Sequence, residues 1–534
     1  MTWQDIAPIL IGPSGRLGGI TTEVAGSKAA QLAQMMRLGL NVPPAFVVPT
    51  TFCGPVNANE PKALEGLRQG LQKGIAWLEQ VTGRRFGDIR NPLLVSVRSG
   101  APQSMPGMLQ TILNLGLNGE TVHGFIRAAG NPRLVWDSYR RFIQAYAEVV
   151  EGVSGADFGQ RLTDMLKREG IVDTAALDPE ALERLTAEFR EIAERLSGRP
   201  LPADPFEQLF AAARAVYRSW EGPRAREYRR LNKLDELAGT AVTVQMMVFG
   251  NCGGNSGAGV AFSRNPATGA NELYVDFLFD AQGEDVVSGR RTPSNAARLA
   301  ARLPQAAKQL EEGARRLDYE FHDAQDIEFT IENGKLYFLQ TRTAKRTPRA
   351  ALHIAVELVH EGAIDTQEAL ARLADIDLGH LGITRFAEPA QPIARAIPAS
   401  SGVASGRVAF DCTRAKKFVD GGEPAILVRP ETSTEDIEGY AVADGILTAT
   451  GGRTAHAAVV ARQLGKACLV GCQSLSFDEQ YRDVMIGNER ICEGDWLSLD
   501  GDTGEITLGN RIIVAERPPE LDELEHWHRV WSAE

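Results

Sequence analysis

One short stretch, residues 451–462, constrains the fold of this chain more than any other. An apolar run at 446–448 precedes its two glycines, and an Ala- and Val-rich run follows them and stops before Gly465. This order predicts a buried strand, a tight turn and a helix that carries His456 in its first turn. A neutral imidazole can attack a phosphoryl group, and the positive end of the helix dipole would stabilise the charge of a phosphohistidine. The alternative is a histidine that only packs within an Ala-rich helix.

Length and composition place the chain among large globular proteins. Its 534 residues are enough for about two to four domains, and 43% hydrophobic and 24% charged residues are ordinary globular values. A net charge of −12 disfavours a general nucleic-acid or membrane-surface role, and no apolar run approaches the roughly 20 residues that span a bilayer. The start lacks the pattern of a signal peptide, and the 6 cysteines form no Cys-x-x-Cys pair. We therefore expect a cytoplasmic protein with reduced thiols, and neither nucleic acid nor membrane as a partner.

Two basic residues in the N-terminal part lie where a phosphate could be bound. Gly26 and Ser27 suit a helix start directly before Lys28, which would bring an ammonium group near nucleotide phosphates. A short apolar strand at 93–97 delivers Arg98 to a loop of small residues, where a guanidinium could bind phosphate through two hydrogen bonds. An ordinary surface lysine and a structural ion pair are the alternatives for these two residues.

Helices and glycines follow in the middle of the chain. Residues 119–240 have mostly helical periodicity, and residues 241–249 form an apolar strand pattern. Glycines then crowd into 250–259, where backbone N–H groups could cover a triphosphate or a tight hairpin could turn. The residues alone leave both structures open.

Segment 325–342 alternates polar and apolar residues on both sides of an Asn-Gly pair. This pattern predicts a β-hairpin in which Asp326 and Glu328 share one strand face, as do Gln340 and Arg342 on the other strand. A plain two-residue turn would place the two pairs on opposite faces. We predict instead an odd loop with a glycine bulge, which sets Glu328 opposite Gln340 and Asp326 opposite Arg342. The oxygens would suit Mg²⁺ with ATP phosphates while Arg342 contacts phosphate; an ordinary cross-strand charge pair is the alternative.

Several of these segments resemble one enzyme family. Residues 451–462 resemble the phosphohistidine signature of the phosphoenolpyruvate-utilising enzymes, and residues 91–117, 281–287 and 325–342 resemble pyruvate phosphate dikinases. Within that resemblance, the run 104–108 favours inorganic phosphate as a second phosphoryl acceptor. The chain departs from the family pattern at Ser27, Ala29, Asp276, Ser401 and Ala455. Asp276 stands where glutamate is more usual, so its side chain has less reach.

The resemblance implies a role for each candidate residue. His456 would be phosphorylated, and ATP would bind on an ATP-grasp domain. The implied nucleotide-binding residues are Lys28, Arg98, Gln245, Asp326, Glu328, Gln340 and Arg342. Glu328 and Gln340 would also bind Mg²⁺, the expected cofactor. Thr454 matches a position that plant members phosphorylate reversibly, and capping of the helix N-terminus is the alternative role for its hydroxyl.

We therefore expect an α/β (α+β) multidomain fold. The expected parts are an ATP-grasp nucleotide-binding domain at 1–346 with a helical insertion at about 119–240, a helical linker at 347–390, a swivelling α/β phosphohistidine domain at 391–510, and a C-terminal tail at 511–534. Family members are longer, because a barrel of ~250 residues binds phosphoenolpyruvate and pyruvate. No TIM barrel fits after the phosphohistidine domain, so we expect the acceptor site on a separate protein. Whether the chain forms a homodimer stays open.

Three functions compete at this point. The leading hypothesis is autophosphorylation of His456 from ATP and inorganic phosphate, giving AMP and pyrophosphate, followed by transfer to pyruvate or another acceptor. The second is an ATP-binding regulatory or scaffold protein derived from a dikinase, without full turnover. The third is direct phosphorylation of a small acceptor.

Overall fold

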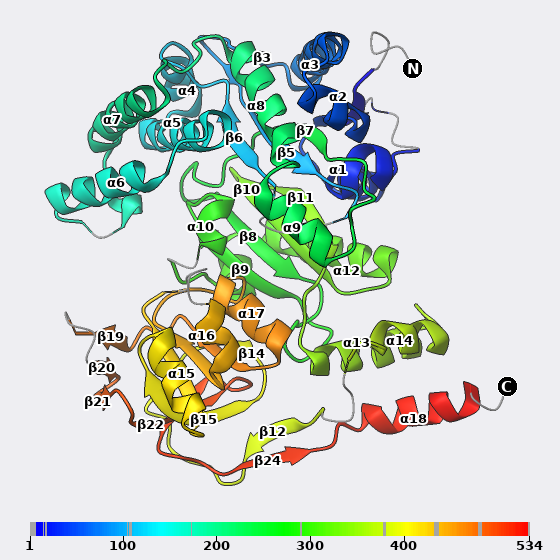
Figure 1. Ribbon diagram of the computed structural model, residues 1–534, viewed down its shortest axis with the longest axis vertical. Helices are drawn as coiled ribbons and strands as arrows, with labels where there is room; N and C mark the ends of the chain where they lie inside the picture. The colour runs from blue at the N-terminus through cyan, green and yellow to red at the C-terminus, as the bar shows by residue number, and fades with distance from the viewer. Residues whose placement is uncertain are drawn as a thin grey trace. The chain divides into compact units, whose positions relative to one another are not determined.

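The computed structural model divides the chain into two compact units (Figure 1). The first contains Met1–Val248 and Tyr337–Gln340, and the second contains Phe249–Leu336 and Thr341–Glu534. The structure describes residues 7–13, 15, 19–103, 105, 109–171, 173–288, 291–376, 381–431, 437–478 and 483–531. Most of the run 104–108, from which inorganic phosphate was inferred, lies outside these residues.

A five-stranded antiparallel sheet forms the centre of the first unit. Its order is β1 (Ile9–Ile11), β2 (Ala45–Val48), β7 (Ala241–Met246), β5 (Val95–Gly100) and β6 (Thr111–Leu115). The whole of β2 is buried, which explains its uninterrupted apolar sequence. Helices α1 (Thr22–Arg37), α3 (Pro61–Thr82) and α8 (Pro205–Ser219) pack against these strands. Gly74 lets α3 approach the sheet closely, because a Cβ there would lie 2.4 Å from the Phe46 ring.

Helices fill residues 121–231 of the same unit, as the periodicity predicts. They are α4 (Thr121–Ala129), α5 (Pro132–Tyr146), α6 (Ala156–Glu169), α7 (Pro179–Ser197), α8 and α9 (Pro223–Leu231). Proline at the first position and an acidic or amide cap start several of them, since Asn131, Asp178 and Asp204 accept backbone N–H bonds from α5, α7 and α8. Shorter elements elsewhere in the first unit are α2 (Cys53–Asn57), β3 (Arg85–Phe86) and β4 (Pro92–Leu93).

The second unit begins with a sheet of order β11-β10-β8-β9. Its strands are β8 (Gly257–Phe262), β9 (Tyr274–Phe279), β10 (Gln325–Glu332) and β11 (Lys335–Thr343). Helices α10 (Gly283–Val287), α11 (Ala296–Arg302) and α12 (Pro304–Phe321) accompany them. Strand β8 pairs antiparallel with both β9 and β10.

The predicted β10–β11 hairpin is confirmed, but its predicted loop is wrong. Asn333 and Gly334 form a two-residue turn with φ of 49° and 81°, as in a type I′ turn, so the loop itself carries no bulge. Nevertheless, Arg342 forms an ion pair with Asp326, which requires both side chains on one face. The backbone N–H of Ala344 donates to the Ala324 carbonyl, one residue out of the register that the turn sets, so the irregularity lies along the strands and not in the loop.

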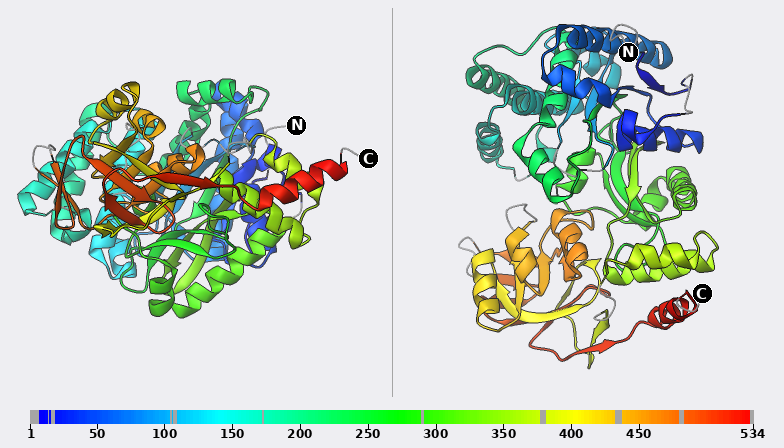
Figure 2. Two further views of the ribbon diagram at one scale, coloured as in Figure 1. Left: turned by 90° about the horizontal axis from the view of Figure 1, so that it is seen from below. Right: turned by 45° about the vertical axis from the view of Figure 1, so that its right-hand side comes forward.

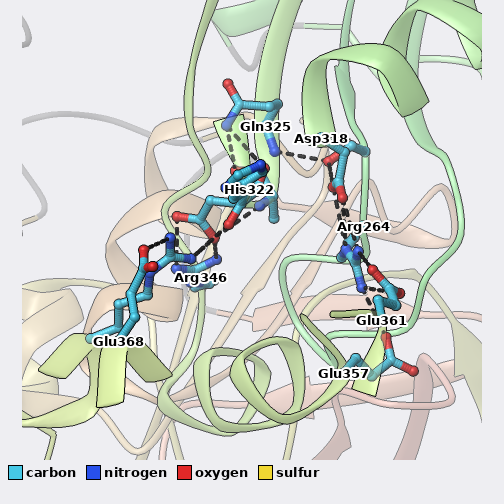
Figure 3. A network of polar contacts seen from close by, with 12 residues as sticks. Arg264, Asp318, His322, Gln325, Arg346, Glu357, Glu361 and Glu368 are labelled. Atoms are coloured by element: carbon cyan, nitrogen blue, oxygen red, sulfur yellow. Dashed lines mark hydrogen bonds and ion pairs between the residues drawn. The ribbon is translucent and has the colours of Figure 1, made fainter. Parts of the chain in front are cut away.

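A buried ion network fixes the helices that follow this sheet (Figure 3). Arg264, 2% exposed, donates to Asp318 of α12 and to Glu357 and Glu361 at the end of α13 (Pro348–His360). Nearby, Arg346 forms an ion pair with Asp323. Helix α14 (Thr366–Leu373) follows α13, so two helices lie in the segment 347–390 for which a helical linker was expected.

The second unit also contains an eight-stranded sheet. We call residues 394–508, which contain this sheet, the His456 module. Its order is β13 (Ala394–Arg395), β23 (Glu505–Leu508), β22 (Trp496–Asp500), β15 (Val403–Ala409), β16 (Ala425–Arg429), β17 (Gly445–Thr448), β18 (Ala467–Val470) and β14 (Ile397–Ser400). The four strands β15 to β18 are parallel neighbours. Helices α15 (Cys412–Asp420), α16 (Ile437–Val442) and α17 (His456–Leu464) accompany them, and β19 (Leu475–Phe477), β20 (Asp483–Ile486) and β21 (Glu489–Cys492) form a small separate sheet.

The segments that enter and leave the His456 module pair with each other. Strand β12 (Ile383–Phe386) precedes the module, and β24 (Ile513–Glu516) follows it in antiparallel register. Helix α18 (Glu520–Trp531), red in Figure 2, continues from β24 and packs against α13 through His353 and Glu520, whose Nδ1 and Oε1 lie 2.7 Å apart. The predicted tail therefore holds ordered structure. Over the residues described, the sheets form no closed barrel and no helix is long and apolar enough to cross a membrane.

Candidate functional site

The start of α1 is fixed to the end of β5 by backbone contact. Gly26 has a φ of 78°, and a Cβ there would lie 1.9 Å from the Gly100 carbonyl oxygen, so only glycine fits. The next residue, Ser27, donates its N–H and its hydroxyl to the Ala101 carbonyl, at 2.9 and 3.0 Å. Ser27, one of the departures from the family pattern, thus adds a side-chain hydrogen bond at this position. Lys28 follows directly, so its backbone is held beside the strand that carries Arg98.

Arg98 lies in a polar cluster with Gln245 and Gln340, which we call the Arg98 cluster. Its guanidinium donates to the side-chain oxygen of Gln340 at 2.9 Å and to that of Gln245 at 3.5 Å. Gln245 is 2% exposed and donates its own amide to the Pro43 carbonyl, which fixes its orientation. The first unit therefore brings three of the predicted nucleotide-binding residues into contact.

Asp326, Glu328 and Arg342 belong to the second unit. Arg342 Nε donates to Asp326 Oδ2 at 2.8 Å, whereas Asp326 Oδ1 is buried and has no hydrogen-bond partner among the described residues. Burial raises the pKa of Asp326; the charge of Arg342 opposes this rise and the charge of Glu328 adds to it. Asp326 is thus a desolvated carboxylate with an oxygen still able to accept a ligand.

These residues fit a magnesium ion that arrives with a nucleotide. The orphaned Asp326 oxygen and the Glu328 carboxylate are hard oxygen donors, and Mg²⁺ in nucleotide sites commonly takes one or two carboxylates plus phosphate and water oxygens. Within the described part of the chain, no group of three or more His, Cys, Asp or Glu could hold a metal alone. Gln340 Oε1 already accepts from Arg98 and keeps a second lone pair. Since Glu328 and Gln340 fall in different units, the ligand geometry stays a proposal.

The turn before His456 forms as predicted, except for the role of Thr454. Gly451 has a φ of 111°, and α17 begins at His456 after Ala455, the N-cap residue. The expectation that Thr454 caps this helix is wrong, because no side chain caps it. Instead, Thr454 donates its N–H and its hydroxyl to Asp276 Oδ2 of β9, at 3.0 and 3.3 Å. The short Asp276 side chain therefore does reach a partner.

Asp276 is the centre of a tight contact between β9 and the His456 module. A Cβ on Gly452 would lie 2.4 Å from Pro293 Cγ and 2.8 Å from Asp276 Oδ2. Burial raises the pKa of Asp276, and the charge of Arg453 and the N–H of Thr454 oppose this rise. A carboxylate so placed can hold the turn only while the two surfaces stay together.

Tyr274 and two arginines extend this contact. The Tyr274 hydroxyl donates to the Pro398 carbonyl at 2.8 Å, and the guanidinium of Arg453 lies 3.8 Å from the Tyr274 ring centroid. Arg462, 1% exposed, donates to the carbonyls of Arg453 and Ala399, at 2.7 and 3.0 Å. Sequence reasoning assigned no role to Tyr274 or Arg462. The alternation of Tyr274 and Asp276 on one face of β9 was the available signal.

Two protein-family models match this chain. Residues 64–303 and 295–362 match the model of the pyruvate phosphate dikinase AMP/ATP-binding domain, which covers more than half of the chain. Residues 421–504, which include the His456 turn, match the mobile domain of PEP-utilising enzymes. The chain therefore belongs to the pyruvate phosphate dikinase family, a family of ATP- and phosphate-dependent phosphotransfer enzymes.

Curated relatives agree with this assignment. The chain is 46% identical over 490 residues to a pyruvate, phosphate dikinase of Clostridium symbiosum, covering 91% of this chain and 56% of the relative. It is 45% identical over 517 residues to one of Rhizobium meliloti (strain 1021), covering 94% and 58%. A chloroplastic enzyme of Flaveria pringlei is 43% identical over 511 residues, covering 95% and 53%. The chain thus spans a little over half the length of these relatives.

Proposed function

We propose that this chain phosphorylates His456 from ATP, as the first half of a dikinase-type reaction. The observation that carries the proposal is the position of His456 at the start of α17, inside the matched mobile domain and in a chain that also matches an AMP/ATP-binding domain. The nucleotide-binding part would be of ATP-grasp type, and the His456 module would swivel between donor and acceptor.

The chemistry balances as two displacements. A nitrogen of His456 attacks the β-phosphorus of ATP, the bond from that phosphorus to the oxygen of the α-phosphate breaks, and AMP leaves. Inorganic phosphate then attacks the γ-phosphorus, and the bond from that phosphorus to the oxygen on the β-phosphorus breaks. Pyrophosphate departs, and one phosphoryl group remains on His456. Phosphoryl transfer of this kind depends mostly on positioning and on neutralisation of phosphate charge.

Each candidate residue has a distinct part in this proposal. Lys28, Arg98 and Arg342 neutralise and orient the phosphates, because ammonium and guanidinium groups donate charge-assisted hydrogen bonds. Gln245 orients Arg98, and Asp326 orients Arg342, through the contacts described above. Glu328 and Gln340 would hold Mg²⁺, which would supply positive charge to neutralise the phosphates there.

The acceptor and the regulation of the reaction are also proposals. The relatives are named pyruvate, phosphate dikinase, so pyruvate is the first acceptor to test, bound outside the two units on further chain or on a separate protein. Thr454 is proposed as a regulatory position, because its hydroxyl bonds the buried carboxylate of Asp276. A phosphate there would bring two negative groups together and oppose docking.

Intact-mass measurement and nucleotide analysis test the half-reaction. The protein would be incubated with Mg²⁺, ATP and inorganic phosphate as wild type, His456→Ala, and His123→Ala, an exposed histidine of α4 as the matched control. We expect one phosphoryl group, AMP and pyrophosphate with the wild type and His123→Ala only. ATP binding without phosphoprotein or AMP in the wild type would reject the proposal.

A further inference from the structure

A cavity of about 670 Å³ opens in the second unit where the chain enters the His456 module. Its walls come from five segments: the start of α13 with the residues before it, Asp375 and Ile376 after α14, strand β12 with the residues before it, the Ser401–Gly402 turn, and the end of α17 from Gln463 to Gly465. None of the nucleotide-binding residues named above lines it. The cavity is therefore a separate feature from the ATP site.

One wall of this cavity carries an excess of positive charge. Lys345, Arg346 and Arg349 line it, against a single acidic lining residue, Asp375. The arginines are already satisfied, since Arg346 pairs with Asp323 (Figure 3) and Arg349 lies 3.2 Å from an oxygen of Asp502. Lys345 forms no ion pair with any residue that the structure describes.

Lys345 is exposed at the cavity, so a ligand from solvent can reach its ammonium group. Partial burial lowers the pKa of Lys345, and the neighbouring charge of Arg342 lowers it further, while Asp326 opposes this. An anion bound beside Lys345 would favour its charged form.

The cavity also has an apolar lining. Ala351, Ile376, Leu381 and Ile383 line it together with the cationic residues. An inorganic anion would leave this surface in water, whereas an anion with an apolar body would cover it. We propose that this cavity binds a small organic anion, with its carboxylate or phosphate group on Lys345 and its apolar body against Ile376, Leu381 and Ile383.

A ligand in this position would also restrain the His456 module. It would touch α13 and β12 on one side, and Ser401, Gly402 and the end of α17 on the other. Bridging these segments stabilises the docked arrangement in which Asp276 holds the turn before His456. The ligand would therefore slow phosphoryl delivery, a consequence that rests on the function proposed above.

Direct binding tests the site without any turnover. Isothermal titration of the full chain would use phenyl phosphate and benzoate as probes, with saturating Mg·ATP present, for wild type, Lys345→Gln and Lys345→Glu. Lys308→Gln, whose side chain is 78% exposed on α12, is the matched control. We expect saturable binding to wild type and control, weakened about tenfold in Lys345→Gln and further in Lys345→Glu, because one charge-assisted contact is lost.

The probes identify the anionic group by their relative affinities. Equal affinity for wild type and Lys345→Glu, or no saturable binding up to about 10 mM, near the limit for so small a ligand, would each overturn the site. The restraint is tested separately by turnover of phosphohistidine with an acceptor. Slower turnover with the probe in wild type but not in Lys345→Glu is expected, and equal rates would overturn the restraint. Absence of phosphohistidine in every sample would instead reject the proposed function.

Discussion

Asp326 has one oxygen on Arg342 and another, Oδ1, buried without a hydrogen-bond partner among the described residues. A folded protein built only for stability would not keep such a group, because a buried unsatisfied oxygen costs about 1–3 kcal/mol. The cost makes sense if a cation and a nucleotide supply the missing partners. At the scale of single residues, the candidate site is therefore visible as a local loss of stability.

Asp326→Asn should stabilise the protein against unfolding while impairing phosphorylation of His456. Burial raises the pKa of Asp326 in the folded state. At a pH above that pKa, the ionised carboxylate therefore destabilises the folded protein. The gain, roughly 1 kcal/mol, should be full at pH 7 and fade as the pH falls towards 3.8, where the carboxyl is protonated in both states. Urea unfolding at pH 7 and pH 4 measures it. A lower stability of the variant at pH 7 would show that the ion pair with Arg342 outweighs the burial.

Gly26→Ala should abolish the fixed start of α1 and weaken ATP binding through Lys28. The added Cβ meets the Gly100 carbonyl oxygen at 1.9 Å, whereas Gly39, at a similar φ of 74°, has nothing within 4 Å of its Cβ. Gly39→Ala therefore isolates the backbone strain of about 1 kcal/mol, and Gly26→Ala should cost at least about 2 kcal/mol more. Thermal unfolding and ATP titration compare the two variants. Equal losses of stability and of ATP affinity would contradict the role of the contact between Gly26 and Gly100.

At the scale of elements, the buried network around Arg264 joins β8, α12 and α13 into one support. Arg264 donates to Asp318, Glu357 and Glu361, and burial of the cation is offset by these carboxylates. Because Glu357 and Glu361 lie at the end of α13, the network holds the C-terminal end of the helix whose first residues line the cavity. The position of α13 therefore depends on elements that are distant in sequence.

Arg264→Met should destabilise the protein by about 3 kcal/mol or more, because it leaves clustered carboxylates without their cation. The matched control is Arg315→Met on α12, whose arginine is 75% exposed and, among the described residues, forms an ion pair only with Glu311. That change should cost under about 0.5 kcal/mol, as exposed pairs do. Denaturant unfolding measures the stability of both variants. Similar losses of unfolding free energy would mean that the network around Arg264 contributes little to stability.

At the scale of the whole molecule, the proposed reaction requires the His456 module to leave the contact that Asp276 makes. The contact is specific: two hydrogen bonds to Thr454 and close packing around Gly452, extended by the hydrogen bond from Tyr274 to the Pro398 carbonyl and by Arg453 over the Tyr274 ring. Such a contact can position the turn and still be released, because each hydrogen bond contributes only about 0.5–1.5 kcal/mol net.

Gly452→Ala should slow phosphorylation of His456 about tenfold or more and leave ATP affinity unchanged. Its Cβ would meet Pro293 and Asp276 only in the docked state, and Gly452 does not have a positive φ that alanine would resist. Gly159→Ala in α6, with nothing within 4 Å, is the control. Rapid-quench measurement of phosphoprotein gives the rates. An unchanged rate would show that this docking is not needed for the chemistry.

Local pattern predicted much of this protein, and its failures have physical causes. The hairpin, the strand carrying Arg98 and the helix starting at His456 depend on neighbouring residues and were predicted correctly. The role of Thr454 was missed, because its partner, Asp276, lies 178 residues away in the chain. The odd loop predicted for the hairpin was wrong, because Asn333 and Gly334 form a two-residue turn.

The antiparallel pairing of β12 with β24 has an evolutionary consequence. Because Ile383 pairs with Glu516 and Phe386 with Ile513, the chain enters and leaves the His456 module at one place. A module with adjacent ends can be transferred between genes as a single cassette, and its new host needs to accommodate only one junction. The same carrier could thus be combined with different donors and acceptors without redesign of its interior.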